Sequence, residues 1–185
     1  MPVYLDLTVG LKEELWSHLL QNETEQVAFV FAAVTADGDT TVFAAQDHYL
    51  AAPGDFRIHS EFHVELTDEA RSRIIKHAGD TGTTLVELHS HPGDVWGAMF
   101  SPSDMYGFKD FVPHCRWRLR NRPYLAIVVS PAGADALAWI DKSGDSVALT
   151  AIRAEGVPVV TSTNQTINNP DPFKREAVEH GPGPL

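Results

Sequence analysis

Apolar and polar residues follow one another along this chain in stretches that are typical of short helices and short strands. Between Leu11 and Leu20 the apolar residues recur with the spacing of an amphipathic helix. The run Glu25–Val34 is almost continuously apolar, which is typical of a buried central strand. A turn at 37–39 and a returning strand at Thr41–Ala45 would complete a hairpin with that run.

The rest of the chain divides into further short elements. We expect helices at Thr67–Ala78 and Ser101–Phe111, strands at Phe62–Leu66, Thr84–Leu88 and Pro123–Ser130, and a second hairpin from Ala136–Ile140 and Ser146–Ala151. Helices and strands interleave, but hairpins make most of the strand connections. The predicted fold class is therefore α/β of the α+β kind, with a mixed sheet flanked by helices rather than a doubly wound parallel sheet.

The length of 185 residues suits one domain. We expect that domain to span residues 1–155 and to be followed, over 156–185, by a C-terminal strap and a disordered tail, because Thr, Asn and Pro accumulate there. The N-terminus lacks the basic start and apolar core of a signal peptide. No apolar run approaches the roughly 20 residues of a membrane span, so we expect a cytoplasmic protein without a membrane partner.

The amino-acid composition excludes some kinds of partner and site for this protein. The chain has 14 basic and 25 acidic residues, a formal charge of −11, which disfavours nucleic acid as a partner. The single cysteine, Cys115, excludes an internal disulfide and a cysteine-rich zinc site. Nine histidines in an acidic chain direct attention to sites in which imidazoles and carboxylates bind a metal.

One segment places such ligands at informative positions. His89 and His91 lie two residues apart at the end of a predicted strand, so both imidazoles can point to the same side. Pro92 ends the strand, and Asp104 follows in the first turn of the next predicted helix. Two histidines and one carboxylate, with an open fourth position, are the ligands of a catalytic zinc ion.

The segment Ser101–Asp104 also has an ordinary structural interpretation. Serine is a favourable N-cap, proline suits the first helical position, and an acid at the third position resembles a capping box. The residues alone leave both interpretations open, a helix start and a metal ligand.

Taken together, an upstream glutamate, the run His89-Ser-His-Pro and the run Ser101-Pro-Ser-Asp resemble the motif of the JAMM (MPN+, JAB domain) metalloproteases. The resemblance covers about residues 11–151. It implies an MPN/JAB-like fold with the layered architecture of cytidine deaminases. The loop 92–100 is longer than is common in the family, and the strand after the glutamate lacks the usual glycines.

The resemblance also implies a role for each residue of the motif. His89, His91 and Asp104 would bind Zn2+, and Ser101 would hydrogen-bond the oxyanion of the tetrahedral intermediate. The upstream glutamate would be the general base. Glu25 matches the family because the small residue Ala28 follows it at the expected offset, whereas Glu23 is the competing candidate.

The function that the resemblance implies is a zinc-dependent isopeptidase or peptidase. It would hydrolyse the amide bond after the C-terminal glycine of a ubiquitin-like protein, with E1-like and E2-like proteins as further partners of the pathway. The alternatives are a metallopeptidase that processes a sulfur-carrier protein or small peptides, a RadC-like domain, and a non-catalytic MPN scaffold.

Other residues carry weaker signals. His59 and His63 could form a second metal site, but the pattern favours a polar strand face. The arginines at alternate positions from Arg116 to Arg122 predict an extended segment with one basic face. Cys115, beside His114, is interpreted as an ordinary cysteine at a helix end rather than as a reactive thiol.

Overall fold

The structure is a computed structural model that describes residues 1–61 and 63–169. Its helical elements are α1 (Val9–Leu19), η1 (Pro53–Asp55), α2 (Asp68–Thr81), α3 (Pro102–Arg118) and α4 (Gln165–Asn168). Its strands are β1 (Val3–Leu7), β2 (Val27–Asp37), β3 (Thr40–Leu50), β4 (Phe56–His59), β5 (Val64–Leu66), β6 (Thr84–Ser90), β7 (Tyr124–Ser130), β8 (Gly133–Trp139), β9 (Val147–Ala148), β10 (Ala151–Ala154) and β11 (Val157–Thr161).

Nine strands form one curled sheet in the order β11-β10-β1-β3-β2-β6-β7-β8-β9, and β4 pairs with β5 in a small second sheet. The pairs of β1 with β10, β1 with β3, and β6 with β7 are parallel, and the other pairs of the large sheet are antiparallel. The expectation of a mixed sheet with hairpin connections is confirmed.

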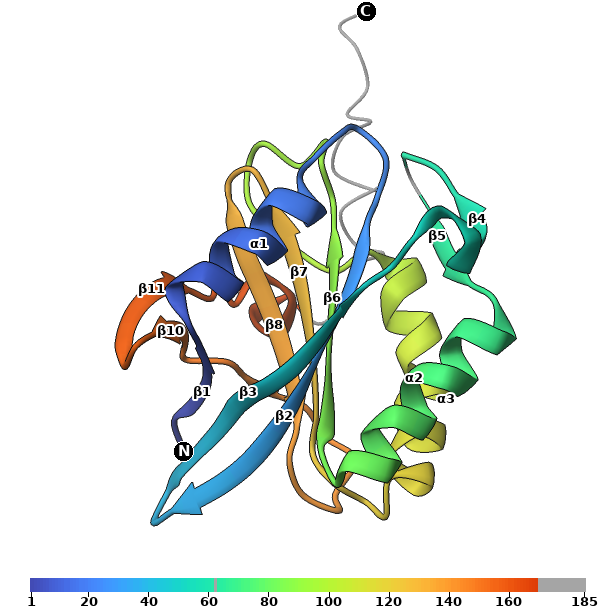
Figure 1. The fold of residues 1–185 in the computed structure, drawn as a ribbon. Coiled ribbons are helices and arrows are strands. Elements are labelled where there is room, and N and C mark those ends of the chain that lie inside the picture. The colour runs from blue at the N-terminus through green and yellow to red at the C-terminus, as the bar shows by residue number, and fades with distance from the viewer. Residues whose placement is uncertain (62, 170–185) are drawn as a thin grey trace, which may run out of the picture.

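Helices cover both faces of the sheet. Figure 1 shows α1 on one face and α2 with α3 on the other. Along β7 every residue is buried, and alternate residues enter two separate hydrophobic cores. Tyr124, Ala126 and Val128 pack on the side of α2 and α3, whereas Leu125 and Ile127 pack on the side of α1. This two-sided burial explains the nearly continuous apolar runs of the sequence.

The predicted starts of α2 and α3 are confirmed by their caps, whereas α1 begins at Val9, two residues before the predicted start. The hydroxyl of Thr67 accepts a hydrogen bond from the amide of Ala70 at the start of α2. Gly82 ends the same helix in the left-handed conformation, with a φ of 72°. The α2 helix therefore runs three residues beyond the predicted end at Ala78.

The extended arginine segment was predicted wrongly. The α3 helix continues through Pro113 to Arg118, so Arg116 lies on a helix rather than on an alternating strand. Its guanidinium is buried and donates to the carbonyl oxygens of Arg122 and Asp141. Arginine spacing alone could not reveal this, because the carbonyl partners come from two later loops.

Two features near the chain ends were not anticipated. β1 forms a parallel strand between β3 and β10, although it is only five residues long. After residue 155, β11 pairs with β10, and α4 packs close to β8. The predicted strap and disordered tail span residues 156–185, of which residues 170–185 lie outside the described residues.

Candidate metal centre

The candidate site lies where β6 ends beside the start of β2. The two strands are antiparallel, and His89 lies opposite Val27. Beyond β6 the backbone stays attached to its neighbours, because the amide of Ser90 donates to the carbonyl of Gln26 and the amide of His91 to the carbonyl of Val129. Both histidines are therefore held by the sheet rather than by a free loop.

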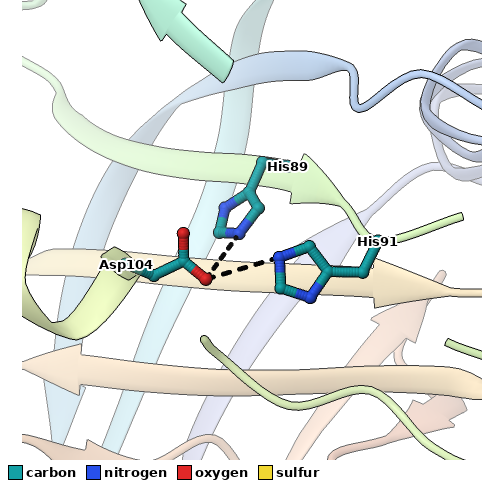
Figure 2. A group of neighbouring side chains, drawn as sticks. All are labelled: His89, His91 and Asp104. Carbon is teal, nitrogen blue, oxygen red and sulfur yellow. Dashed lines mark ion pairs between the residues drawn. The ribbon is translucent and has the colours of Figure 1, made fainter. Parts of the chain in front are cut away.

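Three side chains converge at this point (Figure 2). Nε2 of His89 lies 3.4 Å from Oδ2 of Asp104, and Nε2 of His91 lies 3.3 Å from the same oxygen. One potential ligand atom from each residue lies within 4.8 Å of the others, close enough to bind one metal ion. The structure thus brings together the three residues that the sequence predicted as ligands.

The state of His89 supports the fit to a metal ion. The residue is 4% exposed, and its buried Nε2 has no hydrogen-bond partner among the described residues. A buried polar nitrogen without a hydrogen bond is costly even when, as here, a carboxylate lies within ion-pair distance, and coordination to a metal would satisfy it. His91, by contrast, is oriented through its other nitrogen, since Nδ1 lies 3.2 Å from Oδ2 of Asp94.

Asp104 is both part of the helix cap and a potential metal ligand, the two roles that the sequence left open. Its amide donates to Oγ of Ser101 at 3.2 Å, and its Oδ2 accepts from the amide of Ser101 at 2.7 Å, which is a complete capping box at the start of α3. The same Oδ2 faces both imidazoles. The helix cap therefore positions the carboxylate for metal binding.

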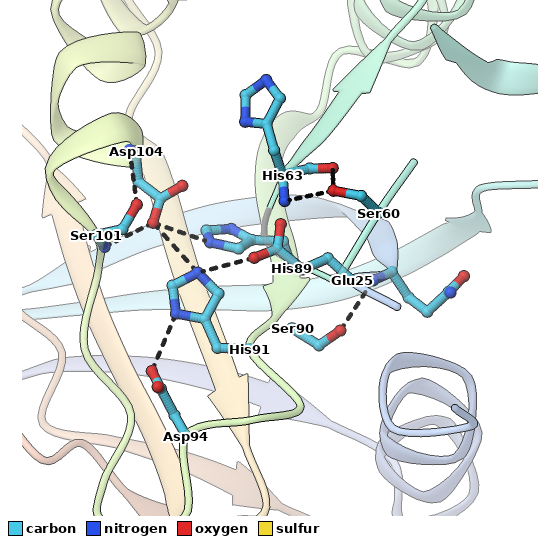
Figure 3. A network of polar contacts seen from close by, with 10 residues as sticks. Glu25, Ser60, His63, His89, Ser90, His91, Asp94, Ser101 and Asp104 are labelled. Atoms are coloured by element: carbon cyan, nitrogen blue, oxygen red, sulfur yellow. Dashed lines mark hydrogen bonds and ion pairs between the residues drawn. The ribbon is translucent and has the colours of Figure 1, made fainter. Parts of the chain in front are cut away.

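Glu25 is the glutamate that reaches the site. Its Oε1 lies 3.6 Å from Nε2 of His91 (Figure 3), and the residue is buried, whereas Glu23 is exposed. Nε2 of His59 lies 2.9 Å from the carbonyl oxygen of Glu25 and holds the backbone just before β2. Burial raises the pKa of Glu25, and the nearby His91 and His89 only partly oppose it.

The charged groups of the site shift one another's pKa values. Burial alone would lower the pKa of His89, but the carboxylates of Asp104, Glu87 and Glu25 together outweigh it and raise the pKa to about 9. Burial would raise the pKa of Asp104, but the two imidazoles lower it well below its usual range. The arrangement of charges therefore favours a positive charge between these groups.

Sequence reasoning missed the residues that orient the ligands. Asp94 contacts His91, and His59 supports the backbone of Glu25. The only signal for Asp94 was its place three residues after His91 in a Pro-Gly turn. The sequence indicated His59 only together with His63, and its contact with the backbone of Glu25 could not be foreseen, because it reaches the site from β4.

The loop 92–100, which connects His91 to the start of α3, is held in place by hydrogen bonds to residues after β11. The amide of Phe100 donates to Oγ1 of Thr166, and the hydroxyl of Thr163 donates to the carbonyl of Ala98. Thr166 is held in turn, because its amide donates to the buried carboxylate of Asp135 in β8. Phe100 is buried. The loop is therefore anchored immediately before Ser101.

The remaining candidates have other surroundings. Cys115 is fully buried in α3, and burial raises the pKa of its thiol to about 12, as expected for a structural cysteine. Within 1–61 and 63–169, His59 and His63 belong to no group of metal-binding geometry. In the same residues, no helix has the length and apolar character needed to cross a membrane.

Comparison with known proteins adds information on the fold. No family model matches the chain, and no curated protein matches it in sequence. The structure is similar to the solution structure of protein DSY2949 from Desulfitobacterium hafniense, with a TM-score of 0.50 and 18% identity. The match covers 83% of this chain and 94% of that chain. At this identity the similarity concerns the fold alone, a mixed α+β arrangement with a large sheet.

Proposed function

We propose that the chain is a zinc-dependent peptidase or isopeptidase of the JAMM type, which hydrolyses the amide bond after the C-terminal glycine of a ubiquitin-like protein. The observation that carries this proposal is the convergence of His89, His91 and Asp104 with Glu25 beside them. Two imidazoles and one carboxylate leave a fourth position of a tetrahedral ion open for water.

His89, His91 and Asp104 would hold the zinc ion. Bound zinc would acidify a water molecule and polarise the carbonyl of the scissile amide. The donor set favours zinc over calcium or magnesium, because two of the three ligand atoms are imidazole nitrogens.

Glu25 would move the proton. Its carboxylate accepts a proton from the attacking water as the carbon–oxygen bond forms, and it delivers that proton to the amide nitrogen as the carbon–nitrogen bond breaks. Its buried position suits this role, since burial raises its pKa towards that of an effective general base.

Ser101 would stabilise the oxyanion. Its Oγ accepts a hydrogen bond from the amide of Asp104, which leaves the hydroxyl proton available to donate. The capping box fixes the position of this oxygen relative to the ligands before a substrate arrives.

The extended C-terminal tail of a ubiquitin-like protein could pair with a strand beside the site. Residues Val64–Leu66 of β5 line the cavity that adjoins His89, and β5 pairs with β4 alone among the described strands. An extended chain could add to the other edge of β5 by backbone hydrogen bonds. The E1-like and E2-like partners and a cytoplasmic location belong to the same proposal.

The test is cleavage by the purified, zinc-loaded chain of a ubiquitin-like protein fused through its C-terminal glycine to a reporter. We expect cleavage after that glycine by the wild type and none by Glu25→Gln. Zinc-loaded protein that cleaves no such fusion would overturn the isopeptidase proposal. If the gently purified protein contains no stoichiometric zinc, the metalloenzyme proposal is overturned and the alternative of a non-catalytic MPN scaffold is favoured.

A further inference from the structure

A cavity of about 780 Å3 opens beside the candidate metal centre. It extends from His89 and Asp104 along the face of β6 and lies between β5, α2 and α3. Phe29, Phe108 and Phe111 contribute apolar parts of its wall. A substrate bound at the metal centre would therefore place a neighbouring group in this cavity.

Glu87 lies in the wall of that cavity, two residues before His89 on the same face of β6. It is half-buried, and its Oε2 accepts a hydrogen bond from the hydroxyl of Tyr124. No ion pair to Glu87 forms within residues 1–61 and 63–169. The remaining acceptor capacity of the carboxylate is available to a ligand.

The one arginine of the cavity wall is engaged elsewhere. The guanidinium of Arg71 lies 3.8 Å from the carboxylate of Glu65 and 5.8 Å from the centre of the Phe111 ring. Asp104 faces the two histidines of the metal centre. Glu87 is thus the inner acid of the cavity that makes no ion pair with a described residue, although the charges of His89 and Arg71 act on it. A carboxylate withdrawn from water gains most from a partner of opposite charge.

We propose that Glu87 makes this cavity a subsite for a positively charged group, a primary ammonium or a guanidinium, on the substrate residue next to the scissile bond. This inference rests on the proposed peptidase function and names a substrate preference of the same site. Residues two apart on a strand are separated by about 7 Å, which is the reach of one extended lysine or arginine side chain from the reacting amide. The aromatic wall would pack against the methylene groups of such a side chain.

The experiment compares peptides that carry lysine or norleucine on one side of the scissile bond, in one series for each side. Norleucine keeps the methylene chain and lacks the charge. We expect the wild type to prefer lysine in one series by about tenfold in kcat/KM. In Glu87→Gln the ratio of the two rates should fall towards one, whatever the absolute rates. An unchanged ratio in Glu87→Gln would overturn the proposal.

Two further variants test whether the charge of Glu87 recognises the substrate or whether Glu87 only supports the structure. Tyr124→Phe removes the hydroxyl that bonds to Glu87 but keeps the carboxylate, so the lysine preference should persist. Glu69→Gln removes the same charge from an exposed position of α2 outside the cavity wall and should leave the preference intact. Loss of the preference in Glu69→Gln would assign it to the general charge of the protein instead.

A binding measurement keeps this inference apart from the proposed chemistry. Nα-acetyl-lysine amide and Nα-acetyl-norleucine amide, which differ only in the side-chain charge, are titrated into the zinc-loaded protein by calorimetry, with Glu87→Gln in parallel. Tighter binding of lysine amide that disappears in Glu87→Gln supports the cation subsite even when no peptide is cleaved. Equal binding of both amides, together with equal cleavage rates, overturns it.

Discussion

Val27 of β2 lies directly opposite His89 of β6 in the antiparallel pair. Side chains alternate between the faces of a strand, so Glu25, two residues before Val27, emerges on the same face as His89 and His91. A slip of one residue would turn the glutamate to the other face. The register of two strands therefore places Glu25 beside the candidate metal ligands.

We predict that the purified protein binds about one zinc ion per chain and that His89→Ala or His91→Ala abolishes this binding, because two ligands cannot replace three. Elemental analysis measures the stoichiometry. A chelator should lower the melting temperature, since zinc at 100 times its Kd stabilises the folded state by about 2.7 kcal/mol. His77→Ala, which removes a half-buried histidine paired with Asp47 and outside the site, is the control; zinc loss in this variant as well would contradict the assignment.

Glu25→Gln should lower kcat by about a hundredfold or more while zinc remains bound, because the amide cannot accept the proton of the attacking water. Glu23→Gln is the matched control, since Glu23 is exposed and outside the site. Steady-state rates and zinc content of both variants are measured together. If Glu23→Gln were the inactive variant, the assignment of the base would be reversed.

Ser101→Ala should affect both stability and rate. Loss of the N-cap of α3 costs about 1 kcal/mol, and loss of the hydroxyl removes the proposed oxyanion donor. Thr67→Ala removes the cap of α2 and matches the loss of stability without touching the site. Denaturant unfolding and kcat are measured for both. If kcat of Ser101→Ala equals that of Thr67→Ala, Ser101 caps the helix but does not stabilise the oxyanion.

Thr166→Val should loosen the loop before Ser101, because the amide of Phe100 loses its acceptor. We expect faster hydrogen exchange at Phe100 and weaker zinc binding, with about 1 kcal/mol lost in stability. Thr150→Val is a matched control, since the Thr150 hydroxyl accepts from the amide of Val3. Equal zinc affinity in the two variants would show that the strap does not position the site.

Asp55 should govern stability in acid. It accepts hydrogen bonds from the Tyr49 hydroxyl, the Ala52 amide and the Arg73 guanidinium; although burial opposes them, these bonds lower its pKa in the folded state. A lowered folded-state pKa gives stability that is present above the unfolded pKa of about 3.9 and lost as pH falls through the folded value.

Asp55→Asn should accordingly lower the free energy of unfolding at pH 7 by about 1.5–3 kcal/mol, the range for hydrogen bonds to a charged group. The difference from wild type should shrink as pH falls below 4, as denaturant unfolding at several pH values would measure. A difference independent of pH would mean that packing, not the charge of Asp55, is responsible.

Local patterns determined much of the fold. The helix start at Thr67 and the capping box at Ser101 depend on neighbouring residues alone, so they could be predicted without the fold. The apolar run of β7 indicated burial on both faces. The short β1 and the continuation of α3 past Pro113 were missed, because distant partners stabilise them.

For the candidate site, the three potential ligands could be predicted from the sequence alone, because His89 and His91 alternate on one strand and Asp104 begins the next helix. The fold was needed to show that Glu25 faces these ligands, that Asp94 and His59 orient the site, and that Glu87 lines a cavity beside it. The reason is physical. Spacing along one element follows from backbone geometry, whereas contacts between elements depend on strand register and on packing between segments far apart in the chain.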